Sequence, residues 1–140
     1  MSRLSSEMVH ATTVAKDGRG VIIAGRSGSG KSDLALRLID RGFVLVSDDQ
    51  TMIIKSGEGL IASAPRTIRG KIEVRGIGIL EMPSHDTAAV SLWVQLSDDI
   101  KRLPEDERHQ ILGIEVPEIS LNAMTASAPI KVELALERLA

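Results

Sequence analysis

A single eight-residue stretch constrains this chain more than any other feature. It is a complete match to the phosphate-loop pattern G-x-x-x-x-G-K-[ST], with the sequence Gly25-Arg26-Ser27-Gly28-Ser29-Gly30-Lys31-Ser32. Glycines let the backbone curl so that several N–H groups point at phosphate oxygens. Lys31 is expected to reach the β- and γ-phosphates, and the hydroxyl of Ser32 to ligate Mg²⁺. We therefore predict that these eight residues bind a nucleotide and its metal ion.

The residues on either side of this loop have the pattern that a P-loop needs. Residues 21–24 form a short, wholly apolar run, which is typical of a strand buried on both faces. Residues 33–41 carry apolar side chains at i, i+4 spacing and stop at Gly42, which predicts a helix. Residues 43–46 form the next apolar run. This order predicts an α/β fold with a P-loop-containing core of strand, loop, helix and strand, and the helix dipole favours an anion at the loop.

Strand patterns dominate the remainder of the chain. Residues 10–14 include three β-branched side chains and predict a strand, followed by an Asp-Gly turn signal at residues 17–18. Gly57-Glu58-Gly59 lies between two apolar runs and predicts a hairpin. Further apolar segments, where we also expect strands, cover residues 72–82, 89–96 and 111–116, with Pro117 ending the last of them.

Length and end composition set the expected domain boundaries. The first nine residues are mostly polar and predict a flexible tail. Because chains of ~100–200 residues usually build one core, residues 10–140 are expected to form a single P-loop domain. Within it, residues 100–110 are charged and contain Pro104, which predicts an exposed loop or a short helix. Residues 131–140 have apolar side chains at helical spacing and predict a C-terminal helix.

Two adjacent carboxylates, Asp48 and Asp49, close the apolar run that follows the predicted helix. Ligands of α/β sheets bind beyond the carboxyl ends of the strands, so these side chains should face the phosphates. Adjacent side chains on an extended chain point in opposite directions, so the two cannot share one role unless the strand has already ended. We predict that one holds Mg²⁺, directly or through water, and that the other takes the proton of an attacking hydroxyl.

Composition argues against several other classes of function. The net charge is -2 and no run of Lys or Arg occurs, so no nucleic-acid partner is expected. Phe43 and Trp93 are the only aromatic residues, so aliphatic walls and backbone would have to hold an adenine. No apolar run approaches the ~20 residues that span a bilayer. Because the chain has no cysteine and its N-terminus does not resemble a secretory signal, we expect a soluble, cytoplasmic protein.

Taken with the P-loop, three further segments resemble the catalytic domain of the HPr kinase/phosphorylase family. They are the aspartate pair that follows residues 42–46, His10 upstream of the P-loop strand, and the segment Ile72-Glu73-Val74-Arg75-Gly76-Ile77-Gly78-Ile79-Leu80. The resemblance extends from about His10 to about Arg102. It implies a kinase that uses ATP and Mg²⁺ to phosphorylate a serine of the phosphocarrier protein HPr, regulates the phosphotransferase system, and can reverse the reaction with inorganic phosphate.

The same resemblance implies roles for individual residues. Asp49 is expected to be the general base for the serine hydroxyl, and Asp48 to support it and the metal site. Glu73 is expected to be a second Mg²⁺ ligand. His10 is expected near the transferring phosphate, and Arg102 lies where the family keeps an active-site arginine. The resemblance further implies a homo-oligomer, usually a hexamer. The chain departs from the family in one respect, since it looks like a short form without the family's separate N-terminal domain.

Two other interpretations of the loop stay open. A P-loop kinase that acts on a small metabolite has the same motif, although such enzymes usually need lid helices with several arginines. The strand-rich second half of this chain leaves little room for such helices. A nucleotide-binding regulatory module without kinase chemistry also fits. A GTPase version of that module is disfavoured, because no Asn-Lys-x-Asp segment occurs in the chain.

Overall fold

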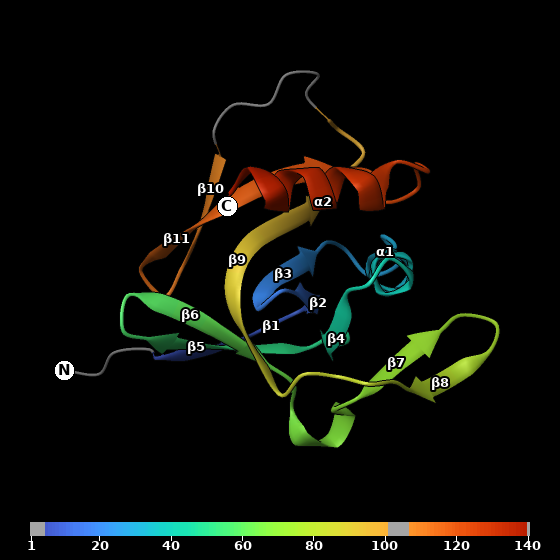
Figure 1. The fold of residues 1–140 in the computed structure, drawn as a ribbon, viewed down its shortest axis with the longest axis horizontal. Helices are drawn as coiled ribbons and strands as arrows, with labels where there is room; N and C mark the ends of the chain where they lie inside the picture. Colours follow the sequence, from blue (N-terminus) through green and yellow to red (C-terminus); the bar gives the residue numbers. More distant parts are fainter. Residues whose placement is uncertain (1–4, 101–106, 140) are drawn as a thin grey trace.

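The architecture comes from a computed structural model, which describes residues 5–100 and 107–139. This part of the chain forms one large sheet, one small sheet and two α-helices (Figure 1). In chain order the elements are β1 (Ser6–Val9), β2 (Ala11–Lys16), β3 (Arg19–Ala24), α1 (Lys31–Asp40), β4 (Val44–Ser47), β5 (Thr51–Ser56), β6 (Gly59–Ser63), the 3₁₀ helix η1 (Arg66–Ile68), β7 (Lys71–Val74), β8 (Gly78–Glu81), β9 (Thr87–Leu96), β10 (Glu107–Ile111), β11 (Ile114–Leu121) and α2 (Ala128–Arg138).

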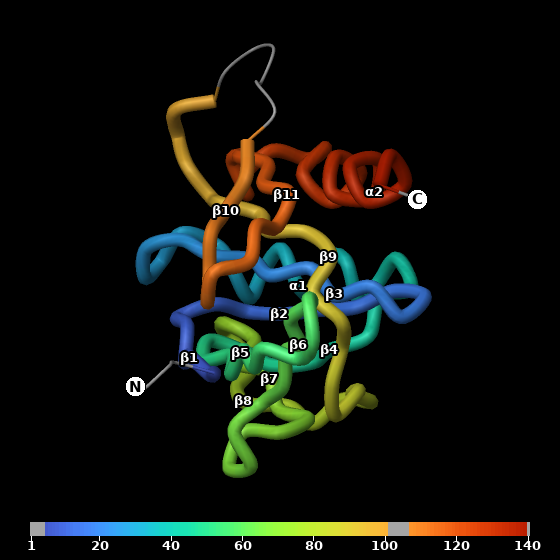
Figure 2. The backbone as a smooth tube through the Cα atoms, turned by 90° about the vertical axis from the view of Figure 1, so that its left-hand side faces the viewer, coloured from blue at the N-terminus to red at the C-terminus, as the bar shows by residue number. Residues whose placement is uncertain are grey.

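Nine strands of the described residues form the large sheet. Seven of them follow one another in the order β1-β5-β6-β9-β3-β2-β4. Strand β9 is long enough to serve further partners, since its first residues pair with β6 and its last residues pair with β11. Strand β11 in turn pairs with β10. Both views place β10, β11 and α2 at one end of the molecule, and the small β7–β8 sheet toward the other end (Figures 1 and 2).

The predicted order of strand, loop, helix and strand is present, and the strand predicted over residues 10–14, observed as β2, is inserted into it in the sheet. Strands β3 and β4 are not neighbours, because β2 lies between them and pairs antiparallel with both. They therefore run parallel to each other, as a helical crossover allows. Strand β2 takes this place because a tight turn folds it directly onto β3. Asp17 and Gly18 form that turn, with φ values of 53° and 75°.

Apolar side chains of β3 alternate between two cores, which explains its uninterrupted apolar sequence. Val21 and Ile23 belong to the cluster that contains Leu38 of α1 and Val132 of α2. Ile22 belongs to a second cluster, with apolar side chains from β5, β6, β9, β10 and β11. The two helices therefore cover one face of the sheet at β3. Strands from the two ends of the same sheet, β5 with β6 and β10 with β11, cover the other face. Packing on both faces fixes β3, and so positions the loop that follows it.

Strand β1 corrects the prediction for the N-terminus. Its residues pair antiparallel with β5, from Ser6 opposite Ile54 to Val9 opposite Thr51. The expected flexible tail over residues 1–9 is therefore wrong for residues 6–9, and residues 1–4 lie outside the described part. The side chains of β1 are largely exposed, including the apolar side chain of Met8. The backbone forms a strand nevertheless, because its N–H and C=O groups find partners on the edge of β5.

Two further corrections concern the last third of the chain. Residues 107–110 were expected in a loop or short helix, but they form most of strand β10. Pro117 was expected to end a strand, but it lies inside β11. Pairing of β11 with β9 begins only at Glu118, so the missing N–H of Pro117 costs no bond in that ladder. The predicted C-terminal helix is confirmed, and it begins earlier than expected, at Ala128.

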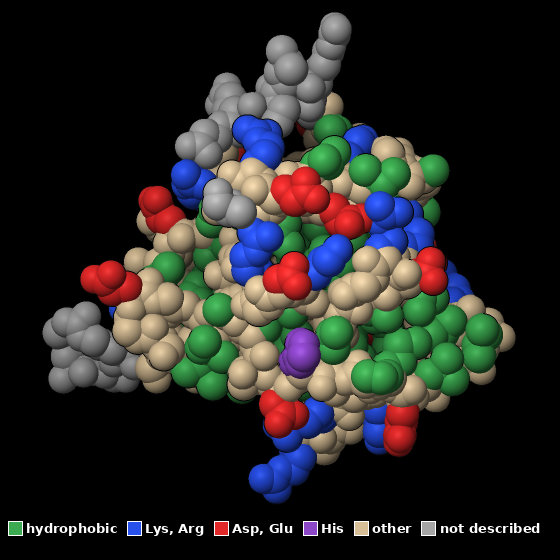
Figure 3. Space-filling model, in the orientation of Figure 1, with side chains coloured by type: hydrophobic (Ala, Val, Ile, Leu, Met, Phe, Trp, Pro, Cys, Tyr) green, Lys and Arg blue, Asp and Glu red, His purple; other side chains and the backbone are tan. Residues whose placement is uncertain are grey.

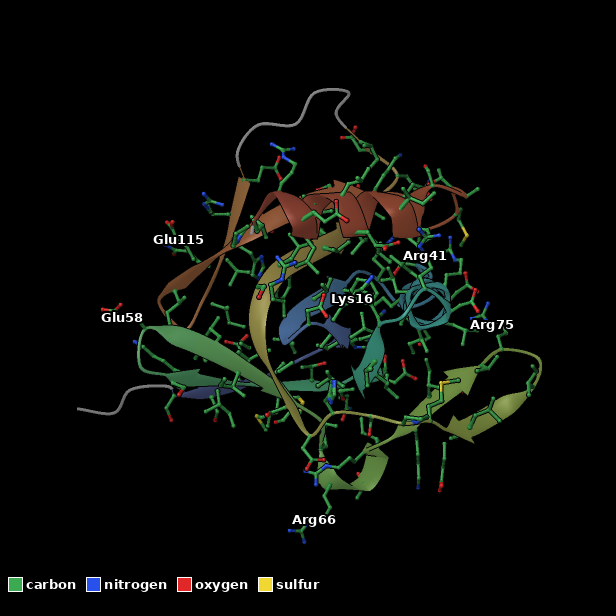
Figure 4. The ribbon with its side chains drawn as sticks, in the orientation of Figure 1. Lys16, Arg41, Glu58, Arg66, Arg75 and Glu115 are labelled. Atoms are coloured by element: carbon green, nitrogen blue, oxygen red, sulfur yellow. The ribbon has the colours of Figure 1, made fainter. Side chains whose placement is uncertain are left out.

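Helix α2 is tied to the rest of the domain through the carboxylate of Glu133. The hydrogen bond from the Arg41 guanidinium, with further attraction from Arg41 and Lys16, holds the pKa of Glu133 below its usual 4.5, against an opposing effect of burial. Lys16 Nζ lies 3.5 Å from Oε2 of Glu133. Lys16 and Arg41 are labelled in Figure 4.

Neither α-helix of the described residues has the length and apolar character that spanning a bilayer requires.

This pairing predicts how acid affects stability. Because the folded-state pKa of Glu133 is depressed, its charge stabilises the fold above the unfolded-state pKa, and that contribution is lost as the pH falls through the folded-state value. We expect Glu133→Gln to lower the melting temperature at neutral pH, and to flatten its fall below pH 4.5. Glu137→Gln, an exposed change on the same helix, is the control. Equal acid profiles for wild type and Glu133→Gln would contradict this account.

Candidate active site

The glycine loop joins the end of β3 to the first turn of α1. Gly28 and Gly30 have φ values of 81° and 100°, which residues with side chains rarely adopt. Lys31 begins α1 and is only 6% exposed. Its Nζ donates to the backbone carbonyls of Gly25 and Arg26, at 3.1 and 3.0 Å. The ammonium group therefore lies over the loop, next to the helix N-terminus that favours an anion.

Asp48 is the centre of a hydrogen-bond network that joins three elements. Strand β4 ends at Ser47, so Asp48 follows the strand, and it is 8% exposed. Its Oδ1 accepts from the hydroxyls of Ser32 (2.6 Å) and Thr12 (3.0 Å). Its Oδ2 accepts from the backbone N–H of Glu73, at 3.0 Å. The network thus brings the start of α1, strand β2 and strand β7 to one carboxylate.

Asp49 has a different environment from its neighbour. Its φ is 68°, and the backbone N–H of Gln50 donates to the carbonyl of Asp48 at 2.8 Å, so the three residues form a γ-turn. Oδ1 of Asp49 lies 2.8 Å from Nε2 of His10, and both side chains are 60% exposed. The γ-turn separates the two carboxylates, so that Asp48 is buried against Ser32 and Asp49 is largely exposed. This separation suits two different roles.

A cavity of about 1100 Å³ lies between the glycine loop, the aspartate pair and the β7–β8 hairpin. Arg75, labelled in Figure 4, lines it from the turn after β7. The predicted site residues that line the cavity are Ser27, Gly28, Gly30, Lys31, Ser32, Asp48, Asp49 and Glu73. A single space therefore contacts both the loop expected to bind phosphates and the carboxylates expected to act on them.

The oxygens around this cavity fit a magnesium ion that is bound together with a nucleotide. Hard cations such as Mg²⁺ prefer oxygen ligands, and usually combine one or two carboxylates with substrate phosphates. Ser32 Oγ and Asp48 Oδ1 supply two protein oxygens 2.6 Å apart, beside the loop. Glu73, whose side chain is exposed, lines the same cavity. No group of three or more His, Cys, Asp or Glu side chains within residues 5–100 and 107–139 is arranged to hold a metal ion.

Comparisons with known proteins agree with this arrangement. The family model described as HPr serine kinase C-terminal domain matches residues 2–137. The chain belongs to this family. Among curated relatives, the HPr kinase/phosphorylase of Caldicellulosiruptor bescii is 40% identical over 122 residues, and that of Caldanaerobacter subterraneus subsp. tengcongensis is 41% identical over 127 residues.

The aligned segments cover most of this HPr kinase C-terminal domain but less than half of each relative's length. They include 77% and 81% of the chain, and 39% and 42% of the two relatives. The chain therefore spans about two fifths of the length of the curated relatives it matches. A solved structure of the HPr(Ser) kinase/phosphatase from Coxiella burnetii superposes with a TM-score of 0.81 at 31% identity, covering 94% of this chain and 95% of that one.

The structure brings together most of the site residues predicted for this family member. His10 contacts Asp49, and Asp48 contacts the hydroxyl of Ser32. Glu73 reaches Asp48 through its backbone, while its side chain is exposed at the cavity. Arg102 lies outside the described residues, so the expectation for it stays a prediction.

Thr12 is the contact residue that the sequence analysis missed. Its hydroxyl bonds both aspartates, donating to Oδ1 of Asp48 and accepting from the backbone N–H of Asp49, each at 3.0 Å. A threonine in a strand usually reflects β-propensity alone, so its residue type gives no signal. The available clue was its position, two residues after His10, on the strand that pairs with the P-loop strand.

Gly25 gives a prediction about the closed shape of the loop. A Cβ atom here would lie 2.6 Å from Ser29 Oγ and 3.0 Å from Cβ of Leu96 in β9. Because overpacking costs ~1–3 kcal/mol, we expect Gly25→Ala to displace Ser29 and to lower the free energy of unfolding by about that amount. Gly59→Ala is the matched control, since its nearest atom would be the carbonyl oxygen of Ser56 at 3.8 Å. Urea unfolding that found wild-type stability for Gly25→Ala would contradict the prediction.

Proposed function

We propose that this domain is an ATP- and Mg²⁺-dependent serine kinase that phosphorylates the phosphocarrier protein HPr and so regulates the phosphotransferase system. One observation carries the proposal: Asp49 is an exposed carboxylate that shares a cavity with the glycine loop and bonds His10 at 2.8 Å. The curated relatives are called HPr kinase/phosphorylase, which supports the same acceptor. That name also supports a reverse reaction, in which inorganic phosphate takes the phosphoryl group.

Within this proposal the glycine loop and its neighbours hold the phosphate donor. The loop N–H groups and Lys31 bind the polyphosphate of ATP. Ser32 and Asp48 hold Mg²⁺, with Glu73 as a further ligand. When bound, the ion neutralises charge that develops on the phosphate oxygens. Little covalent chemistry is asked of the protein, because phosphoryl transfer depends mainly on positioning and on charge stabilisation.

Asp49 acts on the acceptor. His10 engages its Oδ1, and no described residue hydrogen-bonds its Oδ2, so we assign Oδ2 to the proton of the serine hydroxyl. As the proton moves to Oδ2, the serine oxygen bonds to the γ-phosphorus. The bond from that phosphorus to the oxygen bridging the β-phosphate breaks, and ADP leaves. In the reverse direction Asp49 returns the proton to the serine oxygen.

The rim of the cavity supports a protein as the acceptor. Ile77 and Ile79, in the β7–β8 hairpin, are 72% and 69% exposed, and Ile79 lines the cavity. Figure 3 shows apolar side chains gathered on the side of the molecule where this hairpin lies. Exposed apolar patches beside a site are typical of protein contacts. A small hydroxy acid would have no need of such a rim.

The oligomeric state and the cellular compartment are part of the same proposal. We include a homo-oligomer, with the hexamer that the family resemblance implies, and analytical ultracentrifugation would measure it. The absence of cysteine suits the reducing cytoplasm where we place the reaction. The net charge of -2 gives no support for a nucleic-acid partner.

The test compares acceptors at equal ATP and Mg²⁺. Purified domain is incubated with HPr, with a set of small hydroxy acids, or with no acceptor, and phosphate on each acceptor is measured. The proposal expects phosphoserine on HPr and no transfer to the acids. Transfer to a hydroxy acid instead would indicate a small-metabolite kinase. ATP binding without transfer to either would indicate a nucleotide-binding regulatory module.

A further inference from the structure

Thr12 lies between the two aspartates and contacts both. It is 0% exposed and is the second residue of β2. Its hydroxyl proton is given to Oδ1 of Asp48, and a lone pair of the same oxygen accepts the backbone N–H of Asp49, with both distances 3.0 Å. One buried hydroxyl thus connects the inner carboxylate to the backbone that carries the outer one.

The backbone at Asp49 needs such support. A γ-turn with positive φ is rare and strained, and a residue held in this region costs ~1–3 kcal/mol. Strained residues of this kind persist only where their surroundings over-determine them. Here the turn is closed by the N–H of Gln50 on the carbonyl of Asp48 (2.8 Å), and the hydroxyl of Ser47 donates to the carbonyl of Gln50.

Strand β2 anchors the far end of the turn as well. Thr51, the first residue after the turn, donates its hydroxyl proton to the carbonyl of Ala11 at 2.9 Å. That bond holds the chain on β2, but it does not contact either aspartate. The bond to Thr12 is the one that reaches the amide of Asp49, so it acts on the residue whose side chain faces His10.

We propose that Thr12 is a positioning residue, whose hydroxyl holds the γ-turn at Asp49 and so aims that carboxylate at the acceptor hydroxyl. This inference rests on the proposed function for its catalytic consequence, because the aim of Asp49 matters only if phosphate is transferred. Its physical part does not depend on any reaction: removing the hydroxyl should release the Asp49 amide and let the turn relax.

The next residue provides a matched control. Thr13 is also 0% exposed, and its hydroxyl makes a buried hydrogen bond with that of Thr51 at 2.8 Å. It bonds neither Asp48 nor Asp49 through its side chain. Thr12→Val and Thr13→Val therefore remove the same atom from adjacent buried positions, and only the first removal affects the aspartate pair.

The experiment measures kcat for phosphate transfer to HPr, the KM for ATP, and hydrogen exchange at the Asp49 amide. For Thr12→Val we expect kcat to fall by ~10²-fold with KM nearly unchanged, because small displacements of a reacting group cost about that much. Faster exchange at the Asp49 amide should accompany this fall. Thr12→Ser restores the hydroxyl and should recover most of kcat. Thr13→Val should keep wild-type kcat and Asp49 exchange, even if its melting temperature falls equally.

Several results would overturn the inference. They are wild-type kcat in Thr12→Val, an equal fall of kcat in Thr13→Val, or failure of Thr12→Ser to recover activity. If Thr12→Val does not fold, Thr12→Ala removes the same hydroxyl without placing a methyl group in its position. Absence of transfer by the wild type would reject the proposed function. In that case hydrogen exchange at the Asp49 amide still tests whether the Thr12 hydroxyl holds the γ-turn. Unchanged exchange in the variant that lacks the hydroxyl would reject that claim.

Discussion

Asp49→Asn is expected to lower kcat for phosphate transfer to HPr by ~10²–10⁴-fold, which is the range that a positioned general base contributes. The asparagine amide has the shape of the carboxylate, and its oxygen can still accept a hydrogen bond from His10. It cannot take up the proton of the serine hydroxyl. The Kd for ATP should stay near that of wild type, because the carboxylate of Asp49 makes no hydrogen bond with the glycine loop among the described residues.

The control for this substitution is another aspartate of the same cavity. Asp33 lines the cavity near the start of α1, its side chain is 67% exposed, and its Oδ2 lies 3.1 Å from Arg37. Asp33→Asn removes the same charge from the cavity and should keep kcat close to wild type. If Asp49→Asn transferred phosphate at the wild-type rate, the general-base role would be wrong. An equal loss in Asp33→Asn would assign the effect to the field of the cavity rather than to proton transfer.

Lys31→Met is expected to damage both binding and transfer. A hydrogen bond to a charged group contributes ~1.5–3 kcal/mol, so the Kd for ATP should rise by roughly 10- to 150-fold. Transfer should fall further, since removing one donor that stabilises transition-state charge costs ~10²–10³-fold in kcat. Methionine keeps most of the length and apolar stem of the side chain. It loses the ammonium that the structure holds over the loop at Gly25 and Arg26.

Titration calorimetry and single-turnover transfer measure the two effects of Lys31→Met separately. Lys55→Met, on the exposed part of β5 and away from the cavity, is the matched control and should change neither quantity. Circular dichroism should show a folded protein in both variants. Wild-type ATP affinity in Lys31→Met would contradict the claim that Lys31 and the glycine loop bind the phosphates of ATP.

The sequence was sufficient to predict the elements whose formation depends on local pattern. The apolar run at residues 21–24, the glycine loop and the helix after it form as expected, because burial on both faces and helical spacing each leave a clear periodicity. The position of β2 between β3 and β4 was not predictable in this way, because pairing is decided across the sheet. Pro117 misled for the same reason, since its tolerance depends on where β11 meets β9.

For the site, the sequence was enough to predict which residues come together, but not the geometry in which they do so. The motif and the adjacent aspartates were enough to expect different environments for Asp48 and Asp49, but the reason given, alternation along an extended strand, does not apply because β4 ends at Ser47. The γ-turn that separates them depends on backbone conformation at Asp49, which no local pattern of side chains reveals. Thr12 was missed because its role comes from two contacts with residues more than 30 positions away in sequence.

The most direct test of the central claim is to map the phosphate after one turnover. Wild type and Asp49→Asn are mixed with ATP, Mg²⁺ and HPr, quenched, and analysed by mass spectrometry for the acceptor residue. The account predicts one phosphoryl group on a serine of HPr with the wild type, and almost none with Asp49→Asn although that variant binds ATP. Equal phosphorylation by both proteins, or ATP bound by the wild type with HPr left unmodified, would contradict it.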